Sequence, residues 1–114
     1  REMVTDAPKD NLGRGESFSP TDLVAAALGS CMMTTMGIYA ARQGIELAGT
    51  KIEVTKEMIS GPDRRIGKLA TVFHMPPGLP VERRGALERA SMACPVHKNL
   101  HPDVETSVIF QYPD

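Results

Sequence analysis

The feature that most constrains the fold of this chain is a run of nineteen residues, 23–41, without a single charged side chain. Ser19 can cap a helix that starts just before the run, and Pro20 suits its first position. Asp22, three residues after the cap, completes an acidic variant of the capping box. Gly44 can end the helix in a left-handed conformation. The sequence therefore predicts one long apolar helix.

A run of this length and apolarity raises the question of a membrane span, which needs about 20 residues. The run contains Gly, Ser and Thr and many Ala, and its flanks show no aromatic belt or basic cluster. A helix that is apolar on all sides in a soluble chain is typically buried on all sides. We therefore expect the central helix of a globular domain and no membrane partner.

The rest of the chain predicts strands and one further helix. Alternating apolar and polar residues predict a hairpin over 50–59 and 66–75, and 104–112 alternates again. Residues 81–93 are amphipathic, with Val81, Leu87 and Ala90 on one face, and residues 2–5 could add a short strand. The order predicts a single α+β domain over residues 1–114, with an antiparallel sheet packed on helices.

Composition argues against several classes of partner. The net charge is −1, the sequence pI is about 6.3, aromatic residues make up 4% and there is no Trp. Neither a basic face nor stacking platforms for bases are present, so nucleic acid is not an expected partner. A core built from 114 residues is modest, which makes a homo-oligomer plausible.

The two cysteines, Cys31 and Cys94, are the best indication of function. Two cysteines do not make a disulfide framework, and no secretory signal is visible. We therefore expect a cytoplasmic protein whose thiol pair undergoes reversible thiol–disulfide chemistry.

Each cysteine also has a simpler explanation. Cys31 lies in the apolar helix, where a thiol often serves only as a small hydrophobic group. Because burial raises the pKa of a thiol, a reactive role there needs a cation or a hydrogen-bond donor, for which Arg14 and Arg1 are candidates. Cys94 is followed by Pro95, so it can cap a helical turn whose free N–H groups favour a thiolate, or it can be an ordinary turn residue.

Histidines extend the second cysteine segment. His97 and His101 follow Cys94 with spacings that could place three metal ligands on one face, and Cys31 could supply a fourth. His97 could instead act as a base or donor to a thiol, or be a surface residue. Asp22 could orient a cation in the site in addition to its capping role. We predict no bound metal and no cofactor, and keep the Cys/His site as an alternative.

Both cysteine segments resemble motifs of the OsmC/Ohr family. The segment FSPTDLVAAALGSC, residues 18–31, resembles the first cysteine motif, and CPVHKNL, residues 94–100, resembles the second. The order of elements after Ser19 also matches, and the residues around Cys31 are closer to the broad OsmC-like branch. The resemblance implies an intertwined homodimer in which sheets surround the long central helices and the sites lie at the subunit interface.

The resemblance also implies a cofactor-free thiol peroxidase that defends against oxidative stress. Cys31 would react with an organic hydroperoxide to give a sulfenic acid, and Cys94 would resolve it as a disulfide, approaching Cys31 at the subunit interface. A dithiol or a lipoylated protein would then reduce the disulfide. The main alternative is an OsmC-like protein that binds an apolar ligand and keeps its thiols reduced.

The chain departs from the peroxidases of the family in two places. Those members carry Glu directly after the motif proline, where this chain has Thr21 and then Asp22. They also hold an Arg from an early strand against the reactive thiol. We expect the family's N-terminal hairpin to be missing before Arg1.

Overall fold

The computed structural model describes residues 1–113, which form four helical segments and three strands. In chain order these are the 3-10 turn η1 (Lys9–Asn11), α1 (Pro20–Gln43), β1 (Lys51–Ile59), β2 (Arg65–His74), α2 (Val81–Met92), α3 (Pro95–Lys98) and β3 (Glu105–Gln111). The predicted helices and strands are thus confirmed within a few residues at their ends, with two additions, the 3-10 turn η1 and the short helix α3. The expected strand at residues 2–5 is wrong, because that segment has no regular structure.

Helix α1 begins and ends where its capping residues predict. The Ser19 side chain accepts the N–H of Asp22, and the Asp22 carboxylate accepts the N–H of Ser19, at 3.1 and 3.0 Å. This reciprocal pair satisfies two N–H groups that have no partner inside the helix. At the other end Gly44 adopts φ 67°, a left-handed conformation that a residue without Cβ takes up easily.

The sheet is mixed, in the order β1-β2-β3. Strands β1 and β2 form the predicted antiparallel hairpin, whereas β3 pairs with β2 in parallel. The expectation of a wholly antiparallel sheet is therefore corrected at β3. The physical reason is the connection: α2 and α3 carry the chain back along the sheet, so β3 starts at the same end as β2.

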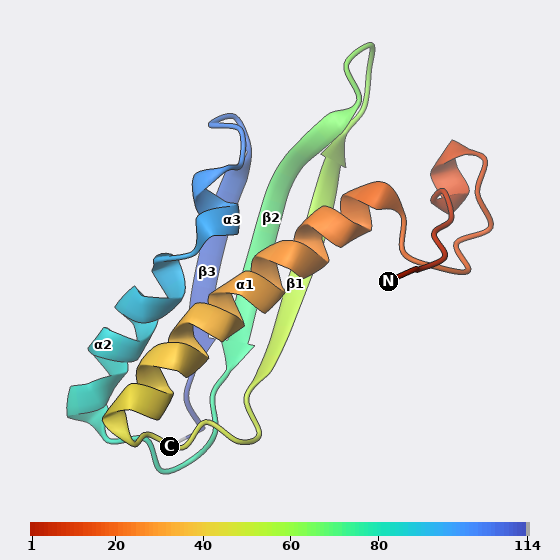
Figure 1. Cartoon of the computed structure of the whole chain (residues 1–114). Coiled ribbons are helices and arrows are strands. Elements are labelled where there is room, and N and C mark those ends of the chain that lie inside the picture. Colours follow the sequence, from red (N-terminus) through yellow and green to blue (C-terminus); the bar gives the residue numbers. More distant parts are fainter. Residues whose placement is uncertain (114) are drawn as a thin grey trace.

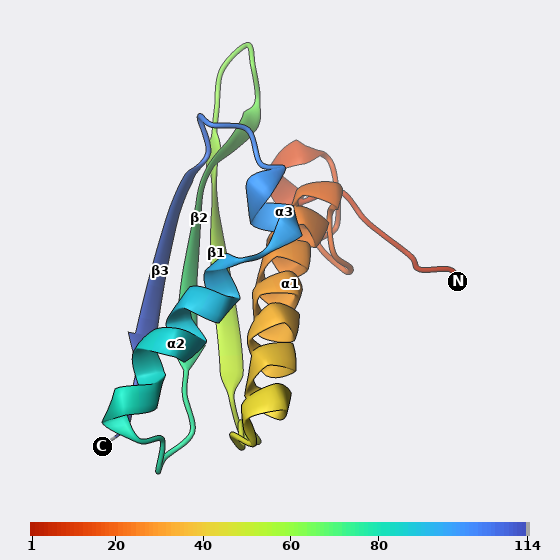
Figure 2. The ribbon, with the colours of Figure 1, turned by 60° about the vertical axis from the view of Figure 1, so that its left-hand side comes forward.

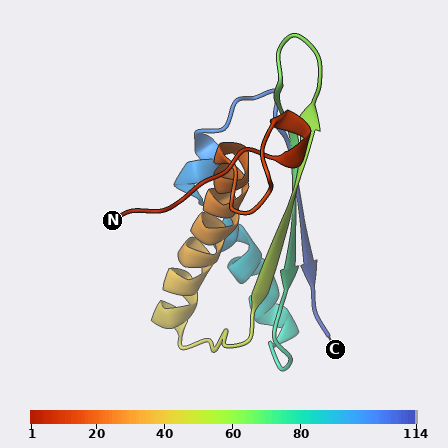
Figure 3. The ribbon, with the colours of Figure 1, turned by 90° about the vertical axis from the view of Figure 1, so that its right-hand side faces the viewer.

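All the α-helices cover one face of this sheet. Figure 1 shows α1 crossing in front of β1 and β2, with α3 in front of β3 and α2 to its left, and Figures 2 and 3 show the opposite face uncovered. The core lies between the two layers. Its fully buried large apolar side chains are Leu28, Met32, Met36, Leu69, Phe73 and Leu87. The α+β fold class is confirmed.

Helix α1 is buried on one side only, which corrects the expectation of a helix buried all round. Its sheet-facing side contributes Leu28, Met32 and Met36 to the core, but Ile38 on the outer side is 49% exposed. The other exposed residues of the uncharged run are Ala26, Ala27, Ser30, Thr34 and Ala41. The reason is that a single sheet can cover only one side of a helix. By length and composition α1 could also cross a membrane, a property shared by the core helices of globular proteins.

Helix α2 differs from the sequence prediction at its first residue. Leu87 is fully buried, but Val81, expected on the same face, is 73% exposed. The C-terminal end of the sheet is attached to this helix by Tyr112, whose hydroxyl donates to Glu88 Oε2 at 2.7 Å. Arg84 lies over the Tyr112 ring, 4.2 Å from its centre.

Candidate functional site

The fold brings the two cysteine thiols together within one chain. Cys31 lies in the middle of α1, and Cys94 is the residue that caps α3. Helix α3 packs against α1, as Figure 2 shows. The two side chains are close enough for Cys31 to raise the pKa of Cys94, and both cysteines are free thiols. The predicted approach of the two sulfurs therefore needs no second subunit.

Cys94 caps α3 as its sequence context predicts. Its sulfur accepts the backbone N–H of His97 at 3.4 Å, and Pro95 occupies the first position of the helix. Burial is nevertheless the strongest influence on this thiol and raises its pKa, and the neighbouring Cys31 side chain raises the pKa further. The N–H group of His97 acts in the opposite direction but is outweighed. Cys94 is thus held as the protonated thiol, in contrast to the thiolate that its capping position alone suggested.

The two thiols differ in their access to solvent. Cys94 is completely buried, whereas Cys31 is partly exposed. Its neighbours Ala27, Ser30 and Thr34 on α1 are exposed. A reagent therefore reaches Cys31 from the outer side of α1, and Cys94 lies behind it.

Asp22 belongs to a second cluster, at the start of α1. Its Oδ1 forms an ion pair of 2.7 Å with Nζ of Lys56 on β1, and Lys56 also donates to Thr21 at 2.9 Å. The hydrogen bond from Lys56 and the N–H of Ser19 lower the pKa of the Asp22 carboxyl. Nine residues along the helix, or about 13 Å, separate Asp22 from Cys31. Asp22 therefore attaches the helix to the sheet and does not reach the thiols.

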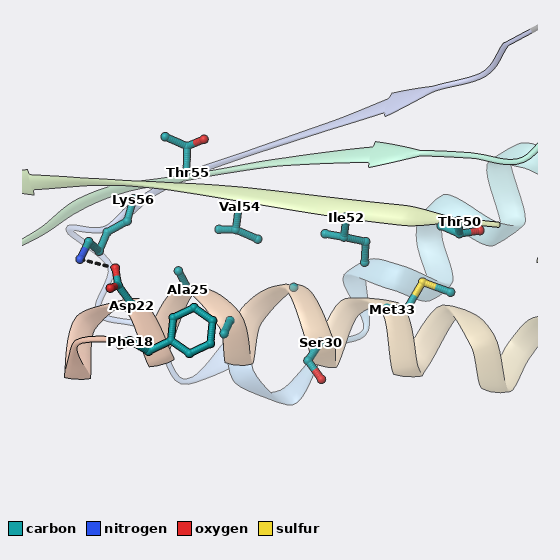
Figure 4. Close-up of a pocket in the computed structure, with 12 residues that line it drawn as sticks. Phe18, Asp22, Ala25, Ser30, Met33, Thr50, Ile52, Val54, Thr55 and Lys56 are labelled. Atoms are coloured by element: carbon teal, nitrogen blue, oxygen red, sulfur yellow. Dashed lines mark hydrogen bonds and ion pairs between the residues drawn. The ribbon is translucent and has the colours of Figure 1, made fainter. Parts of the chain in front are cut away.

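A groove of about 840 Å³ lies between α1 and β1. Figure 4 shows it with the Asp22–Lys56 pair at one end and Met33 toward the other. Its apolar walls come from Phe18, Ile52 and Val54, and Cys31 is not among its lining residues. The step of two positions from Cys31 to Met33 turns the helix by about 200°, so the groove and the thiols lie on different sides of α1.

The other candidate residues lie elsewhere. Arg14 and Arg1 are exposed, and the backbone N–H of Arg14 donates to Asp6. The ring of His97 is hydrogen-bonded to Thr106 on β3, 3.2 Å away, so only its backbone N–H reaches a thiol. Among residues 1–113, no three His, Cys, Asp or Glu side chains lie close enough to hold a metal ion. The alternative Cys/His metal site therefore has no support in the structure.

Sequence reasoning missed two groups that organise the site. Lys56 occupies an inward position of β1, in line with Ile52 and Val54. A charged residue at an inward position of a strand indicates that a partner of opposite charge lies nearby, so the sequence held a signal for this residue. Thr35 donates to the carbonyl of Ser91 at 3.4 Å and so connects α1 to α2 near the cysteines. A threonine in an apolar helix gives no comparable signal.

Comparison with known proteins identifies the family of this chain. The model of the family described as OsmC-like protein matches residues 13–108. No protein with a curated description matches the sequence.

Solved structures share the fold. A protein assigned to the osmotic stress induced and detoxification response of Psychrobacter arcticus is 43% identical, with a TM-score of 0.86 over 94% of this chain and 77% of that one. The organic hydroperoxide resistance protein OsmC of Legionella pneumophila is 20% identical, with a TM-score of 0.75 over 93% of this chain and 78% of that one.

The organic hydroperoxide resistance protein OhrB of Bacillus subtilis is 22% identical, with a TM-score of 0.68 over 83% of this chain and 71% of that one. These last two show the fold alone, whereas the family match extends over most of the chain, including both cysteine segments. The chain belongs to the OsmC-like protein family.

Proposed function

We propose that this protein reduces organic hydroperoxides with its two thiols. The observation that carries the proposal is the contact between Cys31 and Cys94, one accessible and one buried, on two packed helices. In the first step Cys31 as thiolate attacks the peroxide O–O bond, which gives a sulfenate and an alcohol. In the second, the protonated sulfenic acid and the Cys94 thiol form a disulfide and release water.

Two similar folds belong to proteins described as organic hydroperoxide resistance proteins, which supports this class of substrate. The surroundings of Cys31 on α1 are also uncharged, because the helix carries no charged side chain over residues 23–41. An organic peroxide is less costly to bring into such surroundings than hydrogen peroxide, which is more strongly hydrated.

The proposal is tested by counting free thiols after reduced protein is mixed with cumene hydroperoxide or hydrogen peroxide. We expect loss of both thiols per chain and faster reaction with the organic peroxide. Cys94→Ser should lose one thiol and give a sulfenic acid that dimedone traps, and Cys31→Ser should lose none. If neither peroxide consumes thiol within minutes, the peroxidase proposal is overturned.

Turnover also needs a reductant for the disulfide, and we propose a dithiol or a lipoylated protein in the cytoplasm. Cys94 is fully buried, and a small dithiol needs access only to the Cys31 sulfur to begin the exchange. Dihydrolipoamide should restore both thiols faster than glutathione at equal thiol concentration. Equal rates would argue against a dithiol partner.

The proposed working form is a homodimer that covers the outer side of α1, with the site at the subunit interface. That side is uncharged and includes Ile38, 49% exposed, and it borders the accessible side of Cys31. Ile38→Asp should therefore produce monomers in sedimentation analysis. Ile109→Asp is the matched control, because Ile109 is 54% exposed on the uncovered face of the sheet and its change should leave the assembly intact.

The groove between α1 and β1 supports one other function, the binding of an apolar ligand while the thiols stay reduced. Its size and its Phe18, Ile52 and Val54 walls suit such a ligand. A fluorescent fatty-acid probe tests it. Binding that survives in Cys31→Ser, together with no thiol loss in the peroxide assay, would favour this function over the peroxidase.

A further inference from the structure

Two cysteines on different elements form a disulfide only when the packing of those elements holds their sulfurs within bonding reach. Cys31 lies on α1, whose inner side is anchored in the core by Leu28 and Met32. Cys94 lies at the junction between α2 and α3. Its position beside Cys31 therefore depends on how the end of α2 is attached to α1.

The last turn of α2 leaves the carbonyl of Ser91 without its helical partner. In an α-helix the carbonyl of one residue accepts the N–H of the residue four positions later. For Ser91 that residue is Pro95, which has no N–H group. Ser91 is completely buried, and a buried carbonyl without a donor costs free energy. This carbonyl therefore needs a donor from another element.

Thr35 on α1 supplies that donor. Its hydroxyl oxygen lies 3.4 Å from the carbonyl oxygen of Ser91 and 3.1 Å from that of Met32 in its own helix, so one proton is shared between two acceptors. A threonine in a helix commonly bonds back to the preceding turn, and here the same rotamer directs the hydroxyl at α2. Thr35 lies about one turn after Cys31, and Ser91 lies three residues before Cys94. The hydrogen bond therefore joins the two elements beside both cysteines.

Other side-chain contacts of α2 and α3 attach these helices at different places. The ring of His97 holds α3 to β3, and Tyr112 after β3 holds α2. Arg83 in the first turn of α2 donates to the carbonyl of Gln43, the last residue of α1, at 3.3 Å. Gln43 is twelve residues, or about 18 Å, from Cys31 along the helix. These contacts hold the layers together but act away from the thiol of Cys31.

We propose that Thr35 is the positioning residue that holds Cys94 within reach of Cys31 for disulfide formation. This proposal rests on the proposed function and concerns its second step. In that step the Cys94 sulfur displaces the hydroxyl of the Cys31 sulfenic acid. An S–S bond forms, the S–O bond breaks, and the Cys94 proton leaves with the hydroxyl as water. Thr35 takes no part in the bond changes, so the attack of Cys31 on the peroxide does not need it.

The kinetic test compares Thr35→Val, which keeps the shape and loses the donor, with the matched variant Thr35→Ser, which keeps the donor. Reduced protein is mixed with cumene hydroperoxide in the presence of dimedone, and mass spectrometry measures the disulfide and the dimedone adduct of Cys31. We expect both variants to consume the Cys31 thiol at the wild-type rate. The ratio of adduct to disulfide should rise about fivefold in Thr35→Val, as for the loss of one hydrogen bond, and stay near the wild-type value in Thr35→Ser.

A redox titration with glutathione measures the placement of the thiols without any peroxide. Oxidised glutathione converts the two thiols to a disulfide and is itself reduced to two molecules of glutathione. The equilibrium constant for forming the disulfide should fall about fivefold in Thr35→Val and be restored in Thr35→Ser. A uniform loss of stability cancels between the reduced and oxidised proteins, so a merely structural role would leave this constant unchanged. If Thr35→Val does not fold, Thr35→Ala replaces it.

The outcomes separate this proposal from the proposed function. A wild-type adduct ratio and a wild-type equilibrium constant in Thr35→Val overturn the positioning role, and so does an equal change in Thr35→Ser. A protein whose thiols resist both peroxides, but whose glutathione equilibrium falls in Thr35→Val and recovers in Thr35→Ser, keeps the positioning role and loses the peroxidase proposal.

Discussion

Lys56 on β1 holds Asp22 on α1 in an ion pair of 2.7 Å, and the same carboxylate caps the helix. The contact fixes the first turn of α1 on the sheet and thereby the position of Cys31 further along. We expect Asp22→Asn to lower the free energy of unfolding by roughly 0.5–1 kcal/mol, because the side chain is 39% exposed and exposed pairs are weak. A double-mutant cycle with Lys56→Met in urea measures the pair alone, and additive losses would contradict it.

The same carboxyl predicts a pH dependence. The hydrogen bond from Lys56, together with the N–H of Ser19, lowers the pKa of Asp22 in the folded protein. Its contribution is therefore fully present above the unfolded value of about 3.9 and is lost as the pH falls through the folded pKa. The stability difference between wild type and Asp22→Asn should be equal at pH 7 and 5 and shrink below about pH 4. A difference that grows in acid would contradict this assignment.

Gly29 lies where α1 packs closely against β1. A Cβ there would lie 2.9 Å from Cγ2 of Val54, a branched side chain with little freedom to move. Gly29→Ala should therefore destabilise the protein by about 1 kcal/mol despite the better helix propensity of alanine. Gly37→Ala is the matched control in the same helix, because nothing lies within 4 Å of its Cβ position, and it should be stabilising. The midpoint of thermal unfolding should fall in Gly29→Ala and rise in Gly37→Ala. A higher midpoint in Gly29→Ala would contradict the close packing of α1 on β1 at this position.

Thr71 is buried in β2, and among residues 1–113 its hydroxyl has no hydrogen-bond partner. Thr71→Val keeps the shape and removes a buried polar group, so it should stabilise the protein by about 1 kcal/mol. Thr35→Val is the comparison, since the Thr35 hydroxyl donates to carbonyls of Met32 and Ser91 and its loss should be destabilising. Urea unfolding of the two variants should give opposite signs, and equal signs would count against the assignment.

His97 makes two separate contacts, one through its ring and one through its backbone. Its ring binds Thr106, whereas its backbone N–H binds the Cys94 sulfur. His97→Ala should lower stability by about 1 kcal/mol and leave the rate of thiol loss to cumene hydroperoxide little changed, because the backbone donor remains. Thr106→Val removes the same ring contact and should match it in both measurements. A large loss of rate in His97→Ala alone would show that the ring acts on the thiols.

Several features of the fold follow from local patterns. Alternation in 50–59 and 66–75 predicts the hairpin, because side chains on a strand alternate between its faces. Alternation predicts which residues of a strand share a face. It does not predict the direction of β3 or the strand with which β3 pairs. Only the path through α2 and α3 makes β3 parallel to β2.

The candidate site divides in the same way. The residues around Cys31 and Cys94 mark both as candidates, and Pro95 predicts that Cys94 caps a turn. Sequence spacing gives no distance between positions 31 and 94, and it suggested Arg14 and Asp22 as supports that the structure places away from the thiols.

The sequence by itself determined the long uncharged helix, its caps, the hairpin and the two thiols, because each depends on the local chemistry of a few adjacent residues. The tertiary structure alone decided which side of that helix is buried, that Lys56 takes the carboxylate of Asp22, and that Cys94 meets Cys31. These outcomes depend on how one sheet and three α-helices pack, and packing joins residues that lie far apart in the chain. Burial at that junction outweighs the capping effect on Cys94 and holds it as a thiol beside Cys31.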